Sequence, residues 1–317
     1  MSRTAVPSAA GGALLWGTIG PVATLFTSDE VLPAGGIRLA IGAVAMLALG
    51  GRPLTRAWRR RDVVPLLCAA VGLVGFQLSY FAAVHAGGVA VSTAVAIGLA
   101  PVLTGLWTTL AERRAPSRWW PAGTVLAAVG LCLLTFAGSA AVTLSAKGLA
   151  LSTVAAVCFS LQALAIKHLT DHHRDTTALS AMFALAALLL LPVTLATATP
   201  TLLSGRAVLS LLYLGIVAAG ISYWLFAHGI RHLGAPAAVT ISLLEPAAAS
   251  AIAALVLHEP VGPAQWVGIG LVCGAIVLTA MPGPERHFHP NATPDNLDRG
   301  PAPAQAGSAY SGERGGS

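Results

Sequence analysis

Glu245 is a carboxylate in a stretch, 232–258, that otherwise contains no Asp, Glu, Lys or Arg. It lies about ten residues, or about 15 Å, into the helix that this stretch predicts. A carboxylate at such depth among apolar groups costs about 3 kcal/mol, so it is retained mostly for function or with a partner. It can bind a proton or a substrate amine, or it can satisfy backbone carbonyls that Pro246 leaves free. Both roles stay open.

Arg38 is a guanidinium close to one end of a second apolar stretch, which predicts a helix over 33–50. Its long side chain can extend to the end of the helix and reach water, which is the plainer role. It can also attract a substrate carboxylate or pair with Glu245 in one conformation. Arg38 and Glu245 are therefore the candidates for ion or proton coupling.

Histidines form two further groups at the ends of predicted helices. One group is His168, His172 and His173, and the other is His228 and His232. Such boxes resemble those of membrane di-iron desaturases and hydroxylases, but those enzymes need a larger histidine set to complete the metal's coordination. A cation at a helix C-terminus is favoured by the helix dipole, which explains these histidines without a metal. We expect no metal, no cofactor and no enzyme activity.

The composition sets the environment in which these side chains lie. The chain has 317 residues, of which 56% are hydrophobic and only 9% charged, whereas soluble domains carry about 25% charged residues. The mean hydropathy is +0.76. These values exclude a soluble enzyme, a nucleic-acid-binding module, a disulfide scaffold and a disordered chain. They predict an all-α protein that crosses a lipid bilayer several times.

Apolar stretches predict ten membrane-spanning helices, because a helix needs about 20 apolar residues to cross the hydrocarbon core. The uncharged run 63–111 is too long for one span, so we expect a break at Ala86-Gly87-Gly88. The expected spans are 9–27, 33–50, 63–84, 89–110, 119–138, 148–167, 177–197, 207–228, 235–257 and 263–281.

The basic residues predict the orientation of these spans. Fifteen of the 18 Lys and Arg residues fall in the termini and in the loops on the same side as the termini. By the positive-inside rule, this side is cytoplasmic. We expect a bacterial inner (plasma) membrane protein with both termini inside and no nucleic-acid partner. The segment 283–317 is rich in Pro, Gly and Ser and predicts a disordered cytoplasmic tail.

An internal repeat divides the chain into two halves. At an offset of 145 residues, identical pairs include Gly75 with Gly220, Phe81 with Phe226, and Pro101 with Pro246. Each half contains five predicted spans, an odd number, so the second half must be inverted relative to the first. The expected domains are 1–142 and 143–282. Inverted repeats are typical of alternating-access carriers, whose substrate site lies near the midplane between the halves.

The order of several short motifs over residues 9–281 resembles the drug/metabolite transporter superfamily, EamA type. The motifs are Leu15-Trp16-Gly17, Ile37-Arg38-Leu39, Ala100-Pro101-Val102 running to Glu112-Arg113, and Leu244-Glu245-Pro246 running to His258-Glu259 and Trp266. The resemblance implies two five-helix bundles around a central cavity and transport of small organic metabolites. We expect a secondary exporter of amino acids or related compounds; a channel, or a structural membrane subunit, is the alternative. The sequence does not specify the oligomeric state.

The residues expected to line the cavity are polar or aromatic side chains within the spans. They are Trp16, Gln77, Tyr80, Gln162, Tyr223, Trp224 and Glu245. Each of them alone is more often a packing residue or an interhelical hydrogen-bond partner. Pro101 and Pro246 are expected as helix hinges, because each removes a backbone hydrogen bond. Gly17, Gly20, Gly75, Gly98, Gly220 and Gly270 are expected where helices approach closely.

Overall fold

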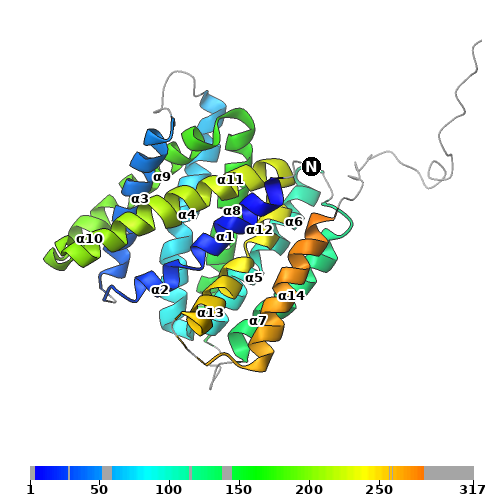
Figure 1. The fold of residues 1–317 in the computed structure, drawn as a ribbon. Coiled ribbons are helices and arrows are strands. Elements are labelled where there is room, and N and C mark those ends of the chain that lie inside the picture. Colours follow the sequence, from blue (N-terminus) through cyan, green and yellow to red (C-terminus); the bar gives the residue numbers. More distant parts are fainter. Residues whose placement is uncertain are drawn as a thin grey trace, which may run out of the picture.

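The computed structural model describes residues 4–27, 29–51, 59–113, 116–137, 145–256, 258 and 260–281. Within these ranges the chain forms helices and no strands (Figure 1). The predicted tail, 283–317, lies outside the described residues.

The first half of the chain contains five helical regions. They are α1 (Ala5–Trp16) with α2 (Ile19–Ala23), α3 (Val31–Ala48), α4 (Arg60–Gly87), α5 (Val89–Gly98) with α6 (Ala100–Leu110), and α7 (Trp120–Phe136). The expected break near Gly87 is confirmed, since α4 ends at that residue.

The second half repeats this succession. It contains α8 (Ala146–His172), α9 (Asp175–Thr197), the 3-10 helix η1 (Pro200–Leu203), and α10 (Gly205–Leu212), which continues through the π-helix η2 (Tyr213–Ile221) into α11 (Ser222–Leu233). Then come α12 (Ala235–Ile241) with α13 (Leu244–Leu255), and α14 (Pro263–Ala280).

Eight helical stretches among the described residues are long and apolar enough to cross a membrane, and α7 is a shorter apolar helix. The prediction of one continuous helix over 9–27 is wrong. The chain turns at Gly17 and Thr18, where the Thr18 hydroxyl donates to the Leu15 carbonyl and α1 separates from the five-residue α2.

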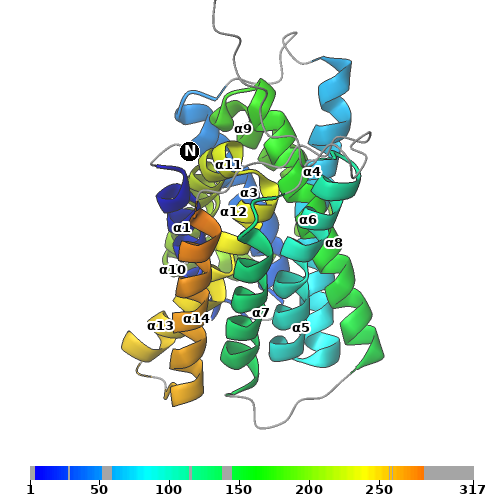
Figure 2. The ribbon, with the colours of Figure 1, turned by 90° about the vertical axis from the view of Figure 1, so that its right-hand side faces the viewer.

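The helices pack in antiparallel pairs, each pair joining the two halves. α4 packs along α8, α3 along α9, α1 along α11, and α7 along α14. Figures 1 and 2 show α7 and α14 side by side, with α1 beside α11. Each helix has a counterpart at the same place in the other half: α1 corresponds to α8, α3 to α9, α4 to α11 and α7 to α14. When every helix is replaced by its counterpart, the α4–α8 pair becomes the α11–α1 pair, and the α3–α9 and α7–α14 pairs stay the same. The packing therefore has the internal symmetry that the sequence repeat predicts.

Glycines allow several of these pairs to approach closely. A Cβ on Gly17 would lie 2.6 Å from the Ala248 Cβ, and one on Gly75 would lie 2.7 Å from the Cys158 sulfur. These two predicted packing positions are confirmed. Gly20 and Gly270 are not packing positions, because no described atom lies within 4 Å of their added Cβ.

The two halves also share their turns and helix breaks. Gly88 ends α4 at φ +81°, and Gly234 ends α11 at φ +83°. The next span is interrupted in both halves, at Leu99 between α5 and α6 and at Ser242 and Leu243 between α12 and α13.

Acidic and basic side chains lie together at one end of the bundle, where α4 begins and α8 and α11 end. We call this end the basic end. Asp62 in the first turn of α4 lies 3.2 Å from His173 at the end of α8. Asp175 at the start of α9 lies 3.3 Å from Arg231 in the last turn of α11. α4 therefore begins at the same end of the bundle at which its counterpart α11 finishes.

Candidate functional site

An aromatic cluster lies at the centre of the bundle, where α1, α8, α9 and α11 meet. The Trp16 ring centroid is 4.9 Å from that of Tyr223, 5.0 Å from Phe226 and 6.4 Å from Phe159. Phe183 packs edge-on against Tyr223 at 5.2 Å. Trp16 is only 4% exposed. The structure thus brings the predicted Trp16 and Tyr223 together.

Gln162 of α8 binds this aromatic cluster through Tyr223. The Gln162 amide nitrogen Nε2 donates to the Tyr223 hydroxyl over 3.1 Å. The same residue is 1% exposed, and among the described residues its Oε1 has no hydrogen-bond partner. A buried amide oxygen without a partner is costly, about 1–3 kcal/mol. It is available to a bound donor.

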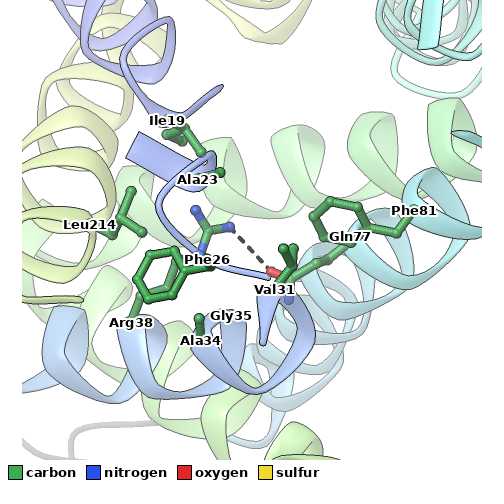
Figure 3. A pocket seen from close by; sticks show the side chains of 10 residues that line it. All are labelled: Ile19, Ala23, Phe26, Val31, Ala34, Gly35, Arg38, Gln77, Phe81 and Leu214. Carbon is green, nitrogen blue, oxygen red and sulfur yellow. Dashed lines mark hydrogen bonds between the residues drawn. The ribbon is translucent and has the colours of Figure 1, made fainter. Parts of the chain in front are cut away.

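Arg38 and Gln77 form a second polar group, closer to the end opposite the basic end. The Arg38 Nη2 donates to the Gln77 Oε1 over 3.2 Å (Figure 3). Both side chains line a cavity of about 60 Å³ between α2, α3, α4 and η2, whose other lining residues are apolar. This volume is enough for a few water molecules. Arg38 therefore points into the protein and not along its helix to the end, which removes the plainer interpretation.

Three buried polar atoms in this region lack partners among the described residues: Trp16 Nε1, Gln77 Nε2 and Gln162 Oε1. The first two donate and the third accepts. Buried polar groups in proteins are nearly always hydrogen-bonded, so orphan groups of both kinds need an explanation. A small polar solute that enters the bundle can satisfy them.

Glu245 lies in the first turn of α13, directly after the break at Ser242 and Leu243. The position favours a carboxylate, since a helix N-terminus carries partial positive charge. Its backbone carbonyl packs on α1, 2.9 Å from where a Gly17 Cβ would be. Glu245 and Arg38 are close enough to interact electrostatically, but the described residues show no ion pair between them within 4.0 Å. The two side chains thus lie near each other without direct contact.

The two prolines follow the two helix breaks. Pro101 is the second residue of α6, and the Ala100 carbonyl beside it accepts from the Thr104 and Ser160 hydroxyls. The Pro246 carbonyl accepts from Ser250. Proline leaves free the carbonyl four residues before it, which is that of Ser242 for Pro246. This carbonyl accepts the Glu245 backbone N–H over 2.9 Å, so the Glu245 side chain is not needed for that purpose. The hinge role of Pro101 and Pro246 stays a prediction.

Tyr80 and Trp224 lie apart from the centre of the site. The Tyr80 hydroxyl is 2.7 Å from the Thr93 hydroxyl, and its ring stacks on Phe76 with centroids 5.5 Å apart. Tyr80 is adjacent to the aromatic cluster through Phe76, which contacts Phe159. Trp224 is 40% exposed, so the structure does not bring it to the cluster.

Sequence reasoning did not find Phe159 and Phe183 of the aromatic cluster, or the Thr93 partner of Tyr80. A phenylalanine within an apolar span gives no signal by itself, because such residues are common there. Only the pairing of helices shows that these side chains meet.

A wider groove of about 730 Å³ lies between α4, α6 and α8. Its lining is mostly apolar and exposed, including Leu106 and Trp107, and it ends near Glu112 and His168. In a bilayer such a surface faces lipid. The described residues contain no group of three or more His, Cys, Asp or Glu that could hold a metal. The Nδ1 atoms of His172 and His232 instead lie 2.8 Å from backbone carbonyls one turn earlier.

The antiparallel bundle of apolar helices, repeated in two halves around buried polar groups, defines a multi-pass membrane protein. The EamA-like transporter family model matches residues 3–136 and 146–281. The chain therefore belongs to this family and is a transporter of the drug/metabolite transporter superfamily.

Two curated proteins show the relationship. The uncharacterized transporter YwfM of Bacillus subtilis (strain 168) is 34% identical over 280 residues, covering 85% of this chain and 92% of that protein. The uncharacterized inner membrane transporter YicL of Salmonella typhimurium (strain LT2) is 21% identical over 278 residues, with the same coverage of both chains. A solved crystal structure matches with a TM-score of 0.76 at 17% identity, over 88% of this chain and 98% of that chain, and supports the fold.

Proposed function

We propose that this transporter is a secondary carrier that exports amino acids or related small metabolites across the bacterial inner (plasma) membrane. Ten membrane-spanning regions form two inverted five-helix halves, and the halves rock about a central site. The helix pairing supports the inversion, since exchanging the halves preserves every pair and α4 begins where α11 ends. No P-loop motif occurs in the sequence, so ATP is not expected as the driver.

The observation that carries the proposal is the separation of Arg38 from Glu245, with orphan polar atoms close to them. The Arg38 guanidinium and the Gln77 amide Nε2 are donors that suit a carboxylate. Glu245 and the Gln162 Oε1 are acceptors that suit an ammonium group. Aromatic rings of Trp16 and Tyr223 provide an apolar or cation-π surface for the rest of the solute.

Counterflow in proteoliposomes tests the carrier. Purified protein is reconstituted with unlabelled amino acid inside, and entry of labelled amino acid is followed. A carrier gives transient accumulation above the equilibrium level, because the inside solute drives exchange. A channel gives only equilibration, and that result would reject the carrier.

The proton-coupling role of Glu245 predicts the behaviour of Glu245→Gln. Glutamine keeps the size of the side chain and an acceptor oxygen for the solute but cannot release a proton. Stimulation of transport by a pH gradient is therefore expected to disappear, while counterflow persists with weaker solute binding. The measurement is labelled-solute flux with and without an imposed gradient. Glu112→Gln, at an exposed carboxylate, is the matched control and keeps the stimulation. Normal stimulation in Glu245→Gln would show that Glu245 does not carry the proton.

A further inference from the structure

The basic end of the bundle is closed by contacts between the two halves of the chain. The His173 Nε2 lies 3.2 Å from the Asp62 Oδ2, joining α8 of the second half to α4 of the first. The Thr4 hydroxyl lies 3.2 Å from the His228 Nε2, joining the start of α1 to α11. These two contacts lie at the same end, and each crosses from one half to the other.

Asp62 is held at the start of α4 by hydrogen bonding and burial. It is 2% exposed, and its Oδ2 also accepts the Arg59 backbone N–H over 2.8 Å, which caps the helix. Arg61 lies 3.8 Å from its other oxygen. The carboxylate is therefore fixed to the first half, whereas His173 approaches it from the second.

His173 lies in the two-residue turn, His173-Arg174, that joins α8 to α9. Asp175, the first residue of α9, contacts Arg231 at 3.3 Å and His228 at 3.9 Å within the second half. The turn therefore moves with α11, and a rotation of the second half carries His173 away from Asp62. The contact cannot persist if the halves separate at this end.

Behind these contacts lies an apolar layer. Leu169 and Ile166 of α8, Ile230 of α11 and Ala238 of α12 are each no more than 2% exposed and belong to one core cluster. The cavity beside Arg38 lies instead toward the opposite end, near Phe26 and Val31. Among the described residues the core between the halves is therefore packed at the basic end and hollowed beside Arg38, while the wider groove that reaches Val64 and His168 lies on the exposed surface of α4, α6 and α8.

From this geometry we infer that Asp62–His173 and Thr4–His228 form a latch between the halves, whose release opens the basic end to the central site. Its role in transport rests on the proposed carrier function, but the opening itself does not. In export the latch must release for solute to reach Arg38 and Glu245 from the side of the basic end.

The latch is tested by the accessibility of a buried cysteine, a readout that needs no transport. Cys68, Cys132, Cys158 and Cys273 are replaced by serine, and Ala238→Cys supplies a reporter on a helix that carries neither latch contact. The purified protein in nanodiscs is treated with a small water-soluble maleimide. In this background, His173→Ala is expected to raise the labelling rate at least threefold.

His172→Ala is the matched control. His172 is the adjacent histidine, is exposed and lies against the carbonyl of His168 on its own helix, so its removal leaves the labelling rate unchanged. Thr4→Ala cuts the other contact without touching α8 and is also expected to raise the rate. If His173→Ala fails to fold, the labelling rate of Thr4→Ala tests the latch instead. Equal rates in His172→Ala and in the folded latch variants would overturn the latch, whatever counterflow shows about the carrier.

Discussion

Individual polar side chains in the core carry most of the functional argument. Gln77 and Gln162 are 4% and 1% exposed, and each leaves one amide atom without a partner among the described residues. Leucine would fit either environment with no such cost. We therefore interpret these two amides, each with one atom that lacks a hydrogen bond, as part of a site in which a bound solute supplies the missing partner.

Glu30 is a carboxylate whose role is stability, and it lies outside the spans at the start of α3. It accepts hydrogen bonds from the Thr201 and Thr199 hydroxyls and, over 2.9 Å, from the Thr27 backbone N–H. The Thr201 hydrogen bond, followed by the Thr27 backbone bond, lowers the pKa of Glu30 below its usual 4.5. A lowered pKa means that the stabilisation is present above the unfolded pKa and is lost as the pH falls through the folded value.

Glu30→Gln is accordingly expected to lower the Tm at pH 7, with the difference from wild type shrinking as the pH falls below about 4.5. Thermal unfolding in detergent from pH 7 to pH 3 measures it. Glu112→Gln removes an exposed carboxylate and serves as control. A difference that stayed constant down to pH 3 would mean that the Glu30 charge contributes nothing.

At the scale of elements, the turns after α4 and α11 depend on glycine. Gly88 has φ +81° and ψ 161°, and Gly234 has φ +83° and ψ 162°. This region is accessible almost only to glycine, because a Cβ clashes with the backbone there, at a cost of about 1–3 kcal/mol. The same turn occurs in both halves and fixes where each broken helix starts.

Gly88→Ala and Gly234→Ala are therefore each expected to destabilise the protein by about 1–3 kcal/mol, seen as a lower Tm. Gly270→Ala is the matched control, since this helical glycine has open space around its Cβ, and we expect it to be neutral or slightly stabilising. If all three variants melted alike, the positive φ would not be the source of strain.

At the scale of the whole molecule, the ten-span topology can be checked by surface labelling. Lys147 and Arg174 are both exposed and lie at opposite ends of α8, Lys147 in its first turn and Arg174 just after its last residue. The positive-inside rule places Arg174 and the basic end in the cytoplasm and Lys147 outside.

In the protein without its native cysteines, Lys147→Cys is expected to react with a membrane-impermeant maleimide in intact cells. Arg174→Cys is expected to react only after the cells are permeabilised. Labelling is read on gels, and the two variants serve as each other's control. The reverse pattern would invert the proposed orientation and would reverse the assigned direction of export.

The sequence by itself determined the membrane environment, the two-half organisation and most outer ends of the helical spans to within a few residues, but not the breaks within the first, fourth and ninth spans. The physical reason is that a helix in a bilayer requires a long uncharged stretch, and such stretches can be recognised directly in the amino-acid sequence. Glu245 and Arg38 were visible for the same reason, since charge is rare in such stretches.

The tertiary structure alone decided which side chains meet. It turned Arg38 inward to Gln77, placed Glu245 at the start of a second half-helix, joined Gln162 to Tyr223 and left Trp224 at the surface. It also brought Asp62 to His173 across the two halves. An apolar helix has no strongly preferred face in its sequence, so its rotation and partners follow from close packing against other helices.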